Sequence, residues 1–359
     1  MHKGGKPLTF AALTVLNLPR FAMFSIRRRA VLAAAALVAV PSLLMAWGNW
    51  GHQRVNRAAV LALPAPMRTF FYNHIDFVVT ESVIPDSRKY VLNDRAEGPR
   101  HYVDLENYGD DLNAIPRAAA DAYAKYDAAL LDKEGRLPWY IQDMLVKLTA
   151  AMKKQHKDEI LFVAADLGHY LGDATQPLHT SANHDGQKTG QKGVHAFYES
   201  QMVEQFGPSY NFKLAEPKFI QDPTAEVWRI VLQAHAAADT LLAVEKQLAA
   251  ATPADQVIEA SNGQPRKNIF NSSYRTQAYT AAVHQKLNRM VERQLRTAAQ
   301  ATANFWYTAW VNAGKPDLTK LDTNYTTKSN EKNLKAELKM LEKGKLVDFS
   351  SFREFPQGQ

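Results

Sequence analysis

The stretch KDEILFVAADLGHYLGDATQPLH, residues 157–179, combines a helical pattern with three potential metal ligands. Its apolar residues recur at spacings of three and four, which predicts a helix that ends before Pro177. His169 and Asp173 are four residues apart, so both side chains project from one side of that helix. Because proline interrupts a helix and redirects the chain, we expect His179 to return toward the same place.

The rest of the chain is dominated by the same helical pattern. Three further amphipathic segments are long enough for helices: 137–155, 225–251 and 277–313. The last of them contains no glycine or proline, which predicts one unbroken helix. Alternation typical of strands is scarce, and a polar, glycine-punctuated loop covers 183–193. We therefore expect an all-α fold, with one multi-helix domain over 47–313 and a peripheral, Lys-rich C-terminal extension, 314–359.

The composition restricts which residues can form a metal site and what the net charge implies about binding partners. The 359 residues include no cysteine, so a zinc site must be built from His, Asp, Glu or backbone groups. The formal net charge is +7, but residues 1–46 carry six lysines and arginines and no acid, and without them the charge falls to +1. Net charge therefore gives no argument for nucleic-acid binding.

Residues 1–46 are typical of a leader with a cleavable secretory signal. The segment 26–46 begins with three arginines, continues with an apolar run and ends on the small residue Ala46. That run is short for a membrane span, although an N-terminal anchor is the alternative. We expect a periplasmic or secreted protein that is cut behind Ala46, so that Trp47 becomes its first residue.

A second pair of candidate ligands follows the polar loop: His195 and Glu199, again four residues apart. A single pair of this kind is more typical of a solvated helix face, but two pairs with His179 between them favour a shared site. Imidazole and carboxylate groups suit zinc. Five such groups are too many for one tetrahedral ion, so we expect a cluster of ions with a bridging carboxylate. Asp166 is a candidate to orient His169, with a plain surface acid as the alternative.

Upstream residues extend this set. The candidates are Trp47 and His52 in WGNWGH, Asp86 in IPDSRKY, and His101 in RHYVD. Each alone is more typical of a core or surface position. Together with the downstream pairs, they resemble the zinc-dependent phospholipase C and single-strand nuclease superfamily, whose members are all-α phosphodiesterases with three zinc ions in one cleft. The resemblance runs from Trp47 to about Glu199, and HYLGDATQPLH is its most specific part.

This resemblance implies nine zinc ligands divided among three ions. The first ion takes Asp86, His101, His169 and Asp173, the second takes His179, His195 and Glu199, and the third takes Trp47, His52 and the shared Asp173. Trp47 would contribute its terminal amine and its carbonyl oxygen. That amine exists only after cleavage behind Ala46, so the uncleaved precursor is expected to lack a complete third site.

The resemblance also implies the reaction, which is hydrolysis of a phosphodiester by a hydroxide held on the metal ions. Asp86 is the usual candidate for the catalytic base. In the nuclease branch, Tyr102 would stack on a base and Asp104 would hydrogen-bond the base edge, although a packed aromatic is the alternative for Tyr102. Lys89 stands where a phosphate-binding arginine is usual, which retains the charge and loses the planar fork.

Two features depart from the nuclease pattern. The last ligand is Glu199, as in the bacterial phospholipases, and the cysteines of the fungal nucleases are missing. Residues 70–79 are the best candidate for an apolar lip that would face a membrane, although a buried helix or strand accounts better for them. We favour a nuclease or 3'-nucleotidase that acts on single-stranded nucleic acid or nucleotides.

Two alternatives stay open. The first is a zinc-dependent phospholipase C that recognises the head group of phosphatidylcholine-like lipids. The second is a non-catalytic, metal-stapled binding protein, which the complete set of ligands argues against. In each case we expect a monomer with no obligate protein partner.

Overall fold

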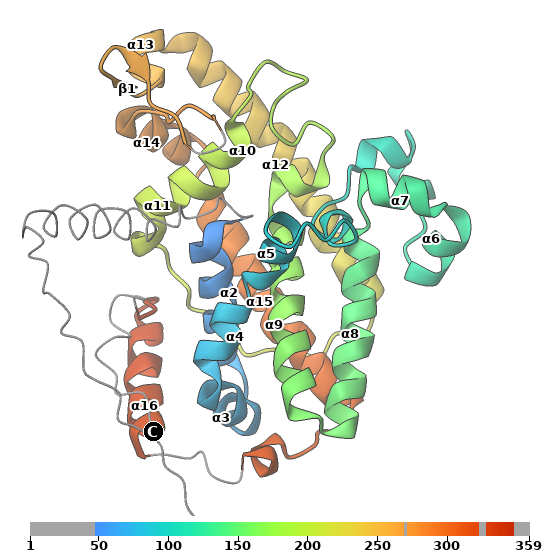
Figure 1. Ribbon diagram of the computed structural model, residues 1–359. Helices are drawn as coiled ribbons and strands as arrows, with labels where there is room; N and C mark the ends of the chain where they lie inside the picture. Colours follow the sequence, from blue (N-terminus) through green and yellow to red (C-terminus); the bar gives the residue numbers. More distant parts are fainter. Residues whose placement is uncertain (1–46, 269–270, 323–327, 348–359) are drawn as a thin grey trace, which may run out of the picture. The chain divides into compact units, whose positions relative to one another are not determined.

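The computed structural model describes residues 47–268, 271–322 and 328–347 (Figure 1). The predicted leader and the cleavage site behind Ala46 lie outside these residues. Helices make up most of the described chain, which confirms the expected all-α class. The described strands are β1 (Ala260–Ser261) and β2 (Gln264–Pro265), which pair antiparallel.

Seven longer helices build the fold: α2 (Gly48–Ala62), α8 (Leu137–Lys154), α9 (Lys157–Thr175), α12 (Pro223–Ala251), α14 (Gln277–Lys286), α15 (Met290–Asn312) and α16 (Lys328–Glu342). The shorter α-helices are α3 (Ala65–Asn73), α4 (Ile75–Glu81), α5 (Ile84–Tyr90), α6 (Ala119–Lys125), α7 (Ala128–Glu134), α10 (Val194–Ala196), α11 (Met202–Phe206) and α13 (Ala254–Val257). Short 3₁₀ segments are η1 (Gly98–Arg100), η2 (Leu105–Tyr108), η3 (Leu112–Ala114), η4 (Pro177–Thr180), η6 (Gly207–Ser209) and η7 (Leu318–Leu321), while η5 (Phe197–Gln201) is a π-helix.

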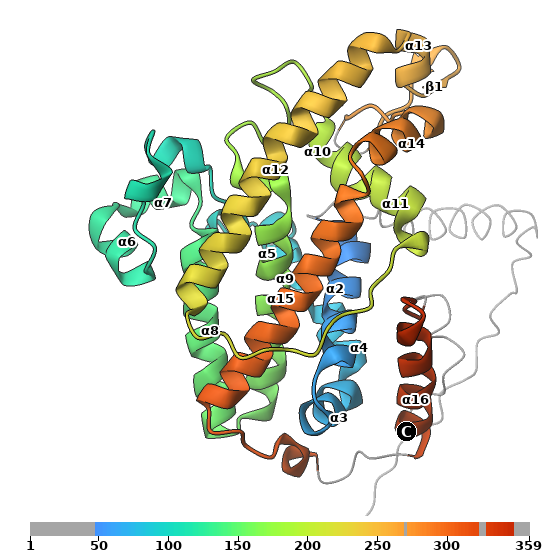
Figure 2. The same ribbon diagram turned by 180° about the vertical axis from the view of Figure 1, so that it is seen from behind.

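Helix α9, which the opening stretch predicts, lies at the centre of the core. It packs against α2, α4, α8, α12 and α15, and the last two run alongside each other when the molecule is viewed from behind (Figure 2). Residues 163–175 are buried on every side. The face that carries His169 and Asp173 is therefore enclosed by protein, although a helix with one apolar stripe would normally leave its other face in solvent.

Two glycines allow α2 to approach α9 closely. A Cβ atom at Gly168 would lie 1.9 Å from Asn56 Oδ1, and one at Gly172 would lie 2.9 Å from the His52 ring. Asn56 cannot move away easily because its Nδ2 donates hydrogen bonds to backbone carbonyls of α4 and α9. The glycines of the H-Y-L-G-D stretch and its preceding turn thus bring a histidine of α2 against α9.

The predicted unbroken helix over 277–313 is wrong, because the segment forms α14 and α15. The break falls at Leu287–Arg289, where Asn288 and Arg289 adopt positive φ angles of 49° and 55°. Asparagine tolerates this left-handed conformation better than most residues. Neither glycine nor proline is needed for such a break, so the absence of both was a poor guide.

The candidate apolar lip, residues 70–79, belongs to the core. It spans the end of α3 and most of α4, where Phe70, Phe71, Val78 and Val79 are fully buried. Phe77 alone among the large apolar residues of this segment is exposed. Across the described ranges, no helix combines the length and apolar character needed to cross a bilayer.

The C-terminal extension contributes α16, which packs against α2 and α3. Its Glu337 is buried and accepts hydrogen bonds from Arg57 Nε at 2.9 Å and from the Tyr72 hydroxyl at 2.7 Å. Arg57 makes a second contact with the same carboxylate through its Nη2 atom. We call Arg57, Tyr72 and Glu337 the α2–α16 anchor. The extension was expected to be peripheral, yet one face of its helix is held by a buried ion pair.

Candidate metal centre

Eight of the nine predicted ligands bring imidazole or carboxylate side chains into one buried region, which we call the ligand cluster: His52, Asp86, His101, His169, Asp173, His179, His195 and Glu199. They come from α2, α5, the end of η1, α9, η4, α10 and η5. Their ligand atoms form three groups, each within 4.8 Å: His52, Asp86 and His169; His101, His169 and Asp173; and His179, His195 and Glu199. These groups could hold metal ions.

Backbone carbonyl groups fix the orientation of three histidines of the ligand cluster. In each, Nδ1 lies within hydrogen-bond distance of a backbone carbonyl oxygen: His169 at 2.8 Å from Ser82, His179 at 2.8 Å from His101, and His195 at 2.9 Å from His184. An Nδ1–H group that donates to a carbonyl leaves Nε2 as the free lone pair, which is the usual state of a metal-binding histidine. The local fold therefore prepares these three rings as ligands.

Asp173 lies between imidazoles from several elements. Its Oδ2 is 3.0 Å from His101 Nδ1 and 3.2 Å from His169 Nε2, and its Oδ1 is 3.5 Å from His52 Nε2. Burial opposes ionisation, but His169 and His179 hold the pKa of Asp173 well below its usual range. Burial likewise disfavours a charged His169, yet Asp173 and Asp86 raise the pKa of that histidine to about 9. At the centre of the cluster, buried carboxylates and imidazoles thus stabilise each other's charged forms.

The cluster has more acceptors than the protein supplies with donors. Among the residues that the structure describes, His52 has no hydrogen-bond partner for either ring nitrogen, and neither do Asp86 Oδ2 and Asp173 Oδ1. In addition, His169 Nε2 lies 3.0 Å from His101 Nδ1. Buried polar atoms are normally paired, and the contact between these two ring nitrogens is a hydrogen bond only if one of them carries a proton. The donor set fits cations that prefer nitrogen and oxygen ligands, of which zinc is one.

The third group lies at the cleft side of the cluster. His195 Nε2 is 2.9 Å from Glu199 Oε2, and His179 Nε2 is 3.7 Å from the same oxygen. Burial works against both charges, but the pair raises the pKa of His195 to about 8 and lowers that of Glu199 to about 2. Glu199 lies on the π-helix η5, a conformation that is common at functional sites. Gln176, which the sequence analysis missed, donates to Glu199 Oε2 at 3.1 Å.

Trp47, the ninth predicted ligand, meets the cluster through its backbone. Its nitrogen lies 3.4 Å from Glu199 Oε2, and its φ angle is 52°. The indole is buried and donates to the carbonyl of Gly172 at 2.7 Å, so it holds the start of α2 against α9. The backbone nitrogen rather than the ring is therefore the group of Trp47 that is near the other ligands.

A cleft of about 610 Å³ opens above the cluster. Asp86, His101, His179, His195 and Glu199 lie on the cluster side of its lining. The remaining polar lining residues are Lys89, Tyr102, Asp104, Lys133, His184, Asp185, Lys192 and Ser272. All three predicted substrate contacts are in this set. His184 and Lys192 were missed because a histidine and a lysine in a polar loop carry no periodic signal, and Lys133 was missed because a lysine near the end of the short helix α7 is typical of a solvated face.

Two of the predicted contacts have distinct surroundings. The Tyr102 hydroxyl donates to the Lys133 carbonyl at 2.9 Å, which fixes the ring at the cleft wall. Burial, with Glu134 and Glu106 nearby, raises the pKa of Asp104 to about 6. Asp104 can therefore be protonated or ionised near neutral pH.

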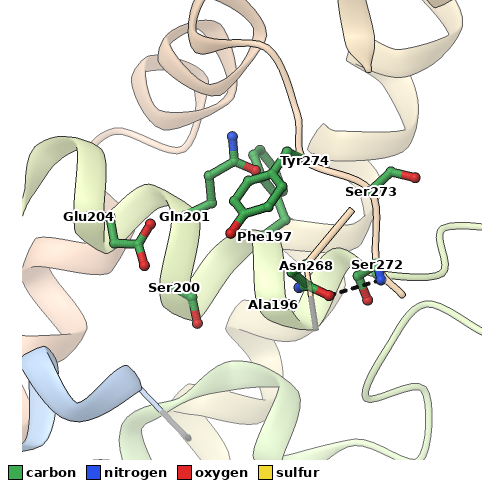
Figure 3. Close-up of a pocket in the computed structure, with 10 residues that line it drawn as sticks. Ala196, Phe197, Ser200, Gln201, Glu204, Asn268, Ser272, Ser273 and Tyr274 are labelled. Atoms are coloured by element: carbon green, nitrogen blue, oxygen red, sulfur yellow. Dashed lines mark hydrogen bonds between the residues drawn. The ribbon is translucent and has the colours of Figure 1, made fainter. Parts of the chain in front are cut away.

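The helix that carries Glu199 is backed by a second, much smaller hollow (Figure 3). Ser200, Gln201 and Tyr274 line it, and Asn268 accepts a hydrogen bond from the Ser272 nitrogen beside it. Its volume of about 10 Å³ leaves room for about one water molecule. This hollow is too small for a substrate, so the cleft is the candidate binding site.

One acid lies next to a cluster histidine on the side of the ring that points away from the cluster, and this acid is Glu97, not Asp166. Asp166 is buried and pairs with Arg88, with 2.5 Å between Oδ2 and Nη2, so neither reading of it from the sequence is right. Glu97 Oε1 lies 3.4 Å from His101 Nε2. The spacing of four between Glu97 and His101 is a signal that the sequence contained and that the sequence analysis did not use.

Comparison with known proteins adds no relative. No model of a known protein family matches the chain, and a search of curated proteins finds no match. The resemblance to zinc phosphodiesterases therefore rests on the motif residues alone and stays a prediction.

Proposed function

We propose that this chain is a zinc-dependent phosphodiesterase that hydrolyses single-stranded nucleic acid or 3'-nucleotides. The proposal rests on a buried ligand cluster in which several polar atoms lack a hydrogen-bond partner among the described residues. This cluster opens into a cleft lined by lysines and a tyrosine. Such a combination suits an anionic phosphodiester, because the cluster and the cleft wall would contact the same phosphate.

In this proposal zinc is held by the nine ligands in the division that the resemblance implies. Zinc at these positions would neutralise phosphoryl charge and lower the pKa of a water. Asp173, with imidazoles on both of its oxygens, is the residue placed to serve two ions. The carbonyl contacts of His169, His179 and His195 keep their Nε2 lone pairs aimed into the cluster.

Asp86 is the proposed base. It is buried and lines the cleft, and its Oδ1 is 3.4 Å from His101 Nδ1. Its Oδ2 has no hydrogen-bond partner within the described part of the chain, so this oxygen can accept a proton from an attacking water. We expect Asp86→Asn to lower the rate about 10²–10⁴-fold.

The cleft wall favours nucleic acid over a choline lipid. Lys89, Lys133 and Lys192 line the cleft, which suits a polyanion, although Lys133 also pairs with Glu134. Tyr102 offers a ring on which a base can stack. A choline head group is normally enclosed by several aromatic rings, whereas Tyr102 is the one Tyr, Phe or Trp among the lining residues that the structure describes.

The deciding experiment compares two substrates. Residues 47–359, loaded with zinc, would be incubated with single-stranded DNA and, separately, with phosphatidylcholine vesicles, each with an EDTA control. We expect EDTA-sensitive release of nucleotides and intact lipid. Release of phosphocholine alone would replace the proposal by a phospholipase C. Bound zinc without turnover of either substrate would favour a binding protein.

A further inference from the structure

One buried acid next to the ligand cluster has no role in the proposal above. Glu97, which is 1% exposed, follows α5 in the chain and precedes η1. Its carboxylate accepts hydrogen bonds from the Tyr170 hydroxyl and from Arg100 Nη1, the latter at 3.0 Å. Arg88 Nε lies 3.4 Å from its Oε2, and His101 Nε2 lies 3.4 Å from its Oε1. Two guanidinium groups thus hold a carboxylate against the back of a candidate ligand.

His101 differs from the other three oriented histidines of the cluster. In His169, His179 and His195, Nδ1 contacts a backbone carbonyl and Nε2 is the ligand atom. In His101 the arrangement is reversed, because Nδ1 faces Asp173 and Nε2 faces away from the cluster. To bind a cation through Nδ1, the neutral ring must carry its proton on Nε2.

The tautomer of His101 therefore needs an acceptor behind Nε2, and the structure places Glu97 there. The separation of 3.4 Å is longer than a well-formed hydrogen bond. Within the described residues, Nε2 of His101 has no closer partner. A small rotation of the ring would close this contact, and apo sites often show such long contacts.

We propose that Glu97 is the positioning residue of His101: it accepts the Nε2–H, fixes the tautomer that turns Nδ1 toward the metals, and raises the basicity of the ring. Carboxylates behind metal-binding histidines act in this way in general. The inference rests on the proposed metal binding. It adds a residue outside the predicted ligand set, together with the two arginines that keep that residue in place.

A purely structural reading must be excluded, because Glu97 also ties the chain before η1 to α5 and α9. The α2–α16 anchor offers a matched control. Glu337 is 4% exposed and, like Glu97, accepts from a tyrosine hydroxyl and from an arginine, but it touches no residue of the ligand cluster. Glu97→Gln and Glu337→Gln both keep the side-chain size and remove a buried charge.

The test uses residues 47–359, as in the activity experiment, with zinc alone as the probe. The two glutamine variants and the wild type would be titrated against a chelator of known affinity, and thermal unfolding would report the loss of stability. We expect Glu97→Gln to weaken the binding of at least one zinc ion about 10–100-fold. We expect Glu337→Gln to lower stability and leave zinc affinity unchanged.

A second readout reports the tautomer directly. In the metal-free wild type, ¹⁵N spectra should show His101 with its proton on Nε2, whereas Glu97→Gln should give a mixture of tautomers. Tyr170→Phe, which removes one hydrogen bond to Glu97 and keeps its charge, should shift zinc affinity in the same direction and less. This milder variant carries the test if Glu97→Gln does not fold.

Two results would overturn the inference. One is equal zinc affinity in the wild type and in a folded Glu97→Gln chain. The other is an equal loss in both glutamine variants, which would mean that the effect comes through stability. A wild type that binds zinc and cleaves no phosphodiester would remove the proposed function alone. A wild type that binds no zinc would remove both proposals.

Discussion

Helix α2 takes part in two buried polar clusters, which differ in whether the protein itself supplies hydrogen-bond partners for their polar atoms. In the α2–α16 anchor, the guanidinium of Arg57 meets the carboxylate of Glu337, and a tyrosine hydroxyl completes the contact. In the ligand cluster, the ring nitrogens of His52 on the same helix and Oδ1 of Asp173 have no hydrogen-bond partner among the described residues. The anchor has cations and anions from the protein itself, whereas the ligand cluster has a surplus of acceptors.

This contrast separates a structural role from a functional one. An unpaired polar atom in the interior costs free energy, so a chain retains a group of them only where something else satisfies them. The carboxylate of the anchor accepts hydrogen bonds from Arg57 and Tyr72, so we expect the anchor to act on stability. The ligand cluster could hold cations. Four predictions test the contrast, in order of decreasing expected effect.

The largest effect is expected from Asp173→Ala. Asp173 has imidazoles near both oxygens, and the proposed division of ligands assigns it to two ions, so its removal should cost about two zinc ions per chain. His52→Ala is the matched variant and should cost about one ion. Zinc per chain would be measured by atomic absorption after gel filtration. Equal zinc content in the two variants would contradict the central place of Asp173.

The next effect concerns the anchor. Glu337→Ala leaves Arg57 buried without its carboxylate, and we expect a loss of about 3–5 kcal/mol in the free energy of unfolding. Zinc content should stay at the wild-type level. Urea unfolding at saturating zinc gives the first quantity, and the double variant Arg57→Met/Glu337→Leu should recover most of the loss. If Glu337→Ala also loses zinc, the two clusters are coupled through α2.

A tyrosine from each region sharpens the comparison further. Tyr102 lines the cleft, so Tyr102→Ala should weaken the binding of single-stranded DNA by about 1–3 kcal/mol, while Tyr102→Phe keeps the stacking ring and most of the affinity. Tyr72→Phe removes only the hydroxyl of the anchor and should change stability without changing this affinity. Fluorescence anisotropy would measure DNA binding in all three. Equal affinity in Tyr102→Ala and the wild type would remove Tyr102 from the proposed contacts.

The smallest effect is expected at Asp104, an acid with other acids nearby. Its pKa of about 6 lies above the ordinary value of about 4 for aspartate, so the folded chain binds more protons than the unfolded chain between these values. Stability from this group is therefore present at pH 4 and lost as the pH rises through 6. Relative to the wild type, Asp104→Asn should gain stability from pH 4 to pH 7. Thermal unfolding across this range is the measurement, and a constant difference would contradict the shifted pKa.

The parts of the fold that depend on local pattern were predictable. The spacing of apolar residues predicted α8, α9 and α12, because neighbours three and four apart share a face whatever the rest of the chain does. The break at Asn288 was not predictable, since a left-handed residue leaves the composition of the segment unchanged. Ligand types and spacings indicated a metal cluster, and the structure brings these residues together.

Long-range pairs lie beyond such a pattern. Arg57 and Glu337 are 280 residues apart, and no periodicity connects them. The spacing of four between Glu97 and His101 can be read from the sequence, but an acid at that spacing usually faces solvent. The structure shows that Glu97 is instead buried, because Tyr170 and the arginines pack against it. The lysines of the cleft depend in the same way on which short helices and loops the fold brings together.

The close packing at Gly168 and Gly172 has a genetic consequence. A single-base change converts either codon to one for alanine, and the added methyl group would push against Asn56 or against the ring of His52. Such an allele keeps every histidine and acid of the cluster, but it would shift α2 away from α9. A sequence that keeps all the ligands can therefore still have a disturbed cluster. The ligands together with Gly168 and Gly172 are a better indication of an intact cluster than the ligands alone.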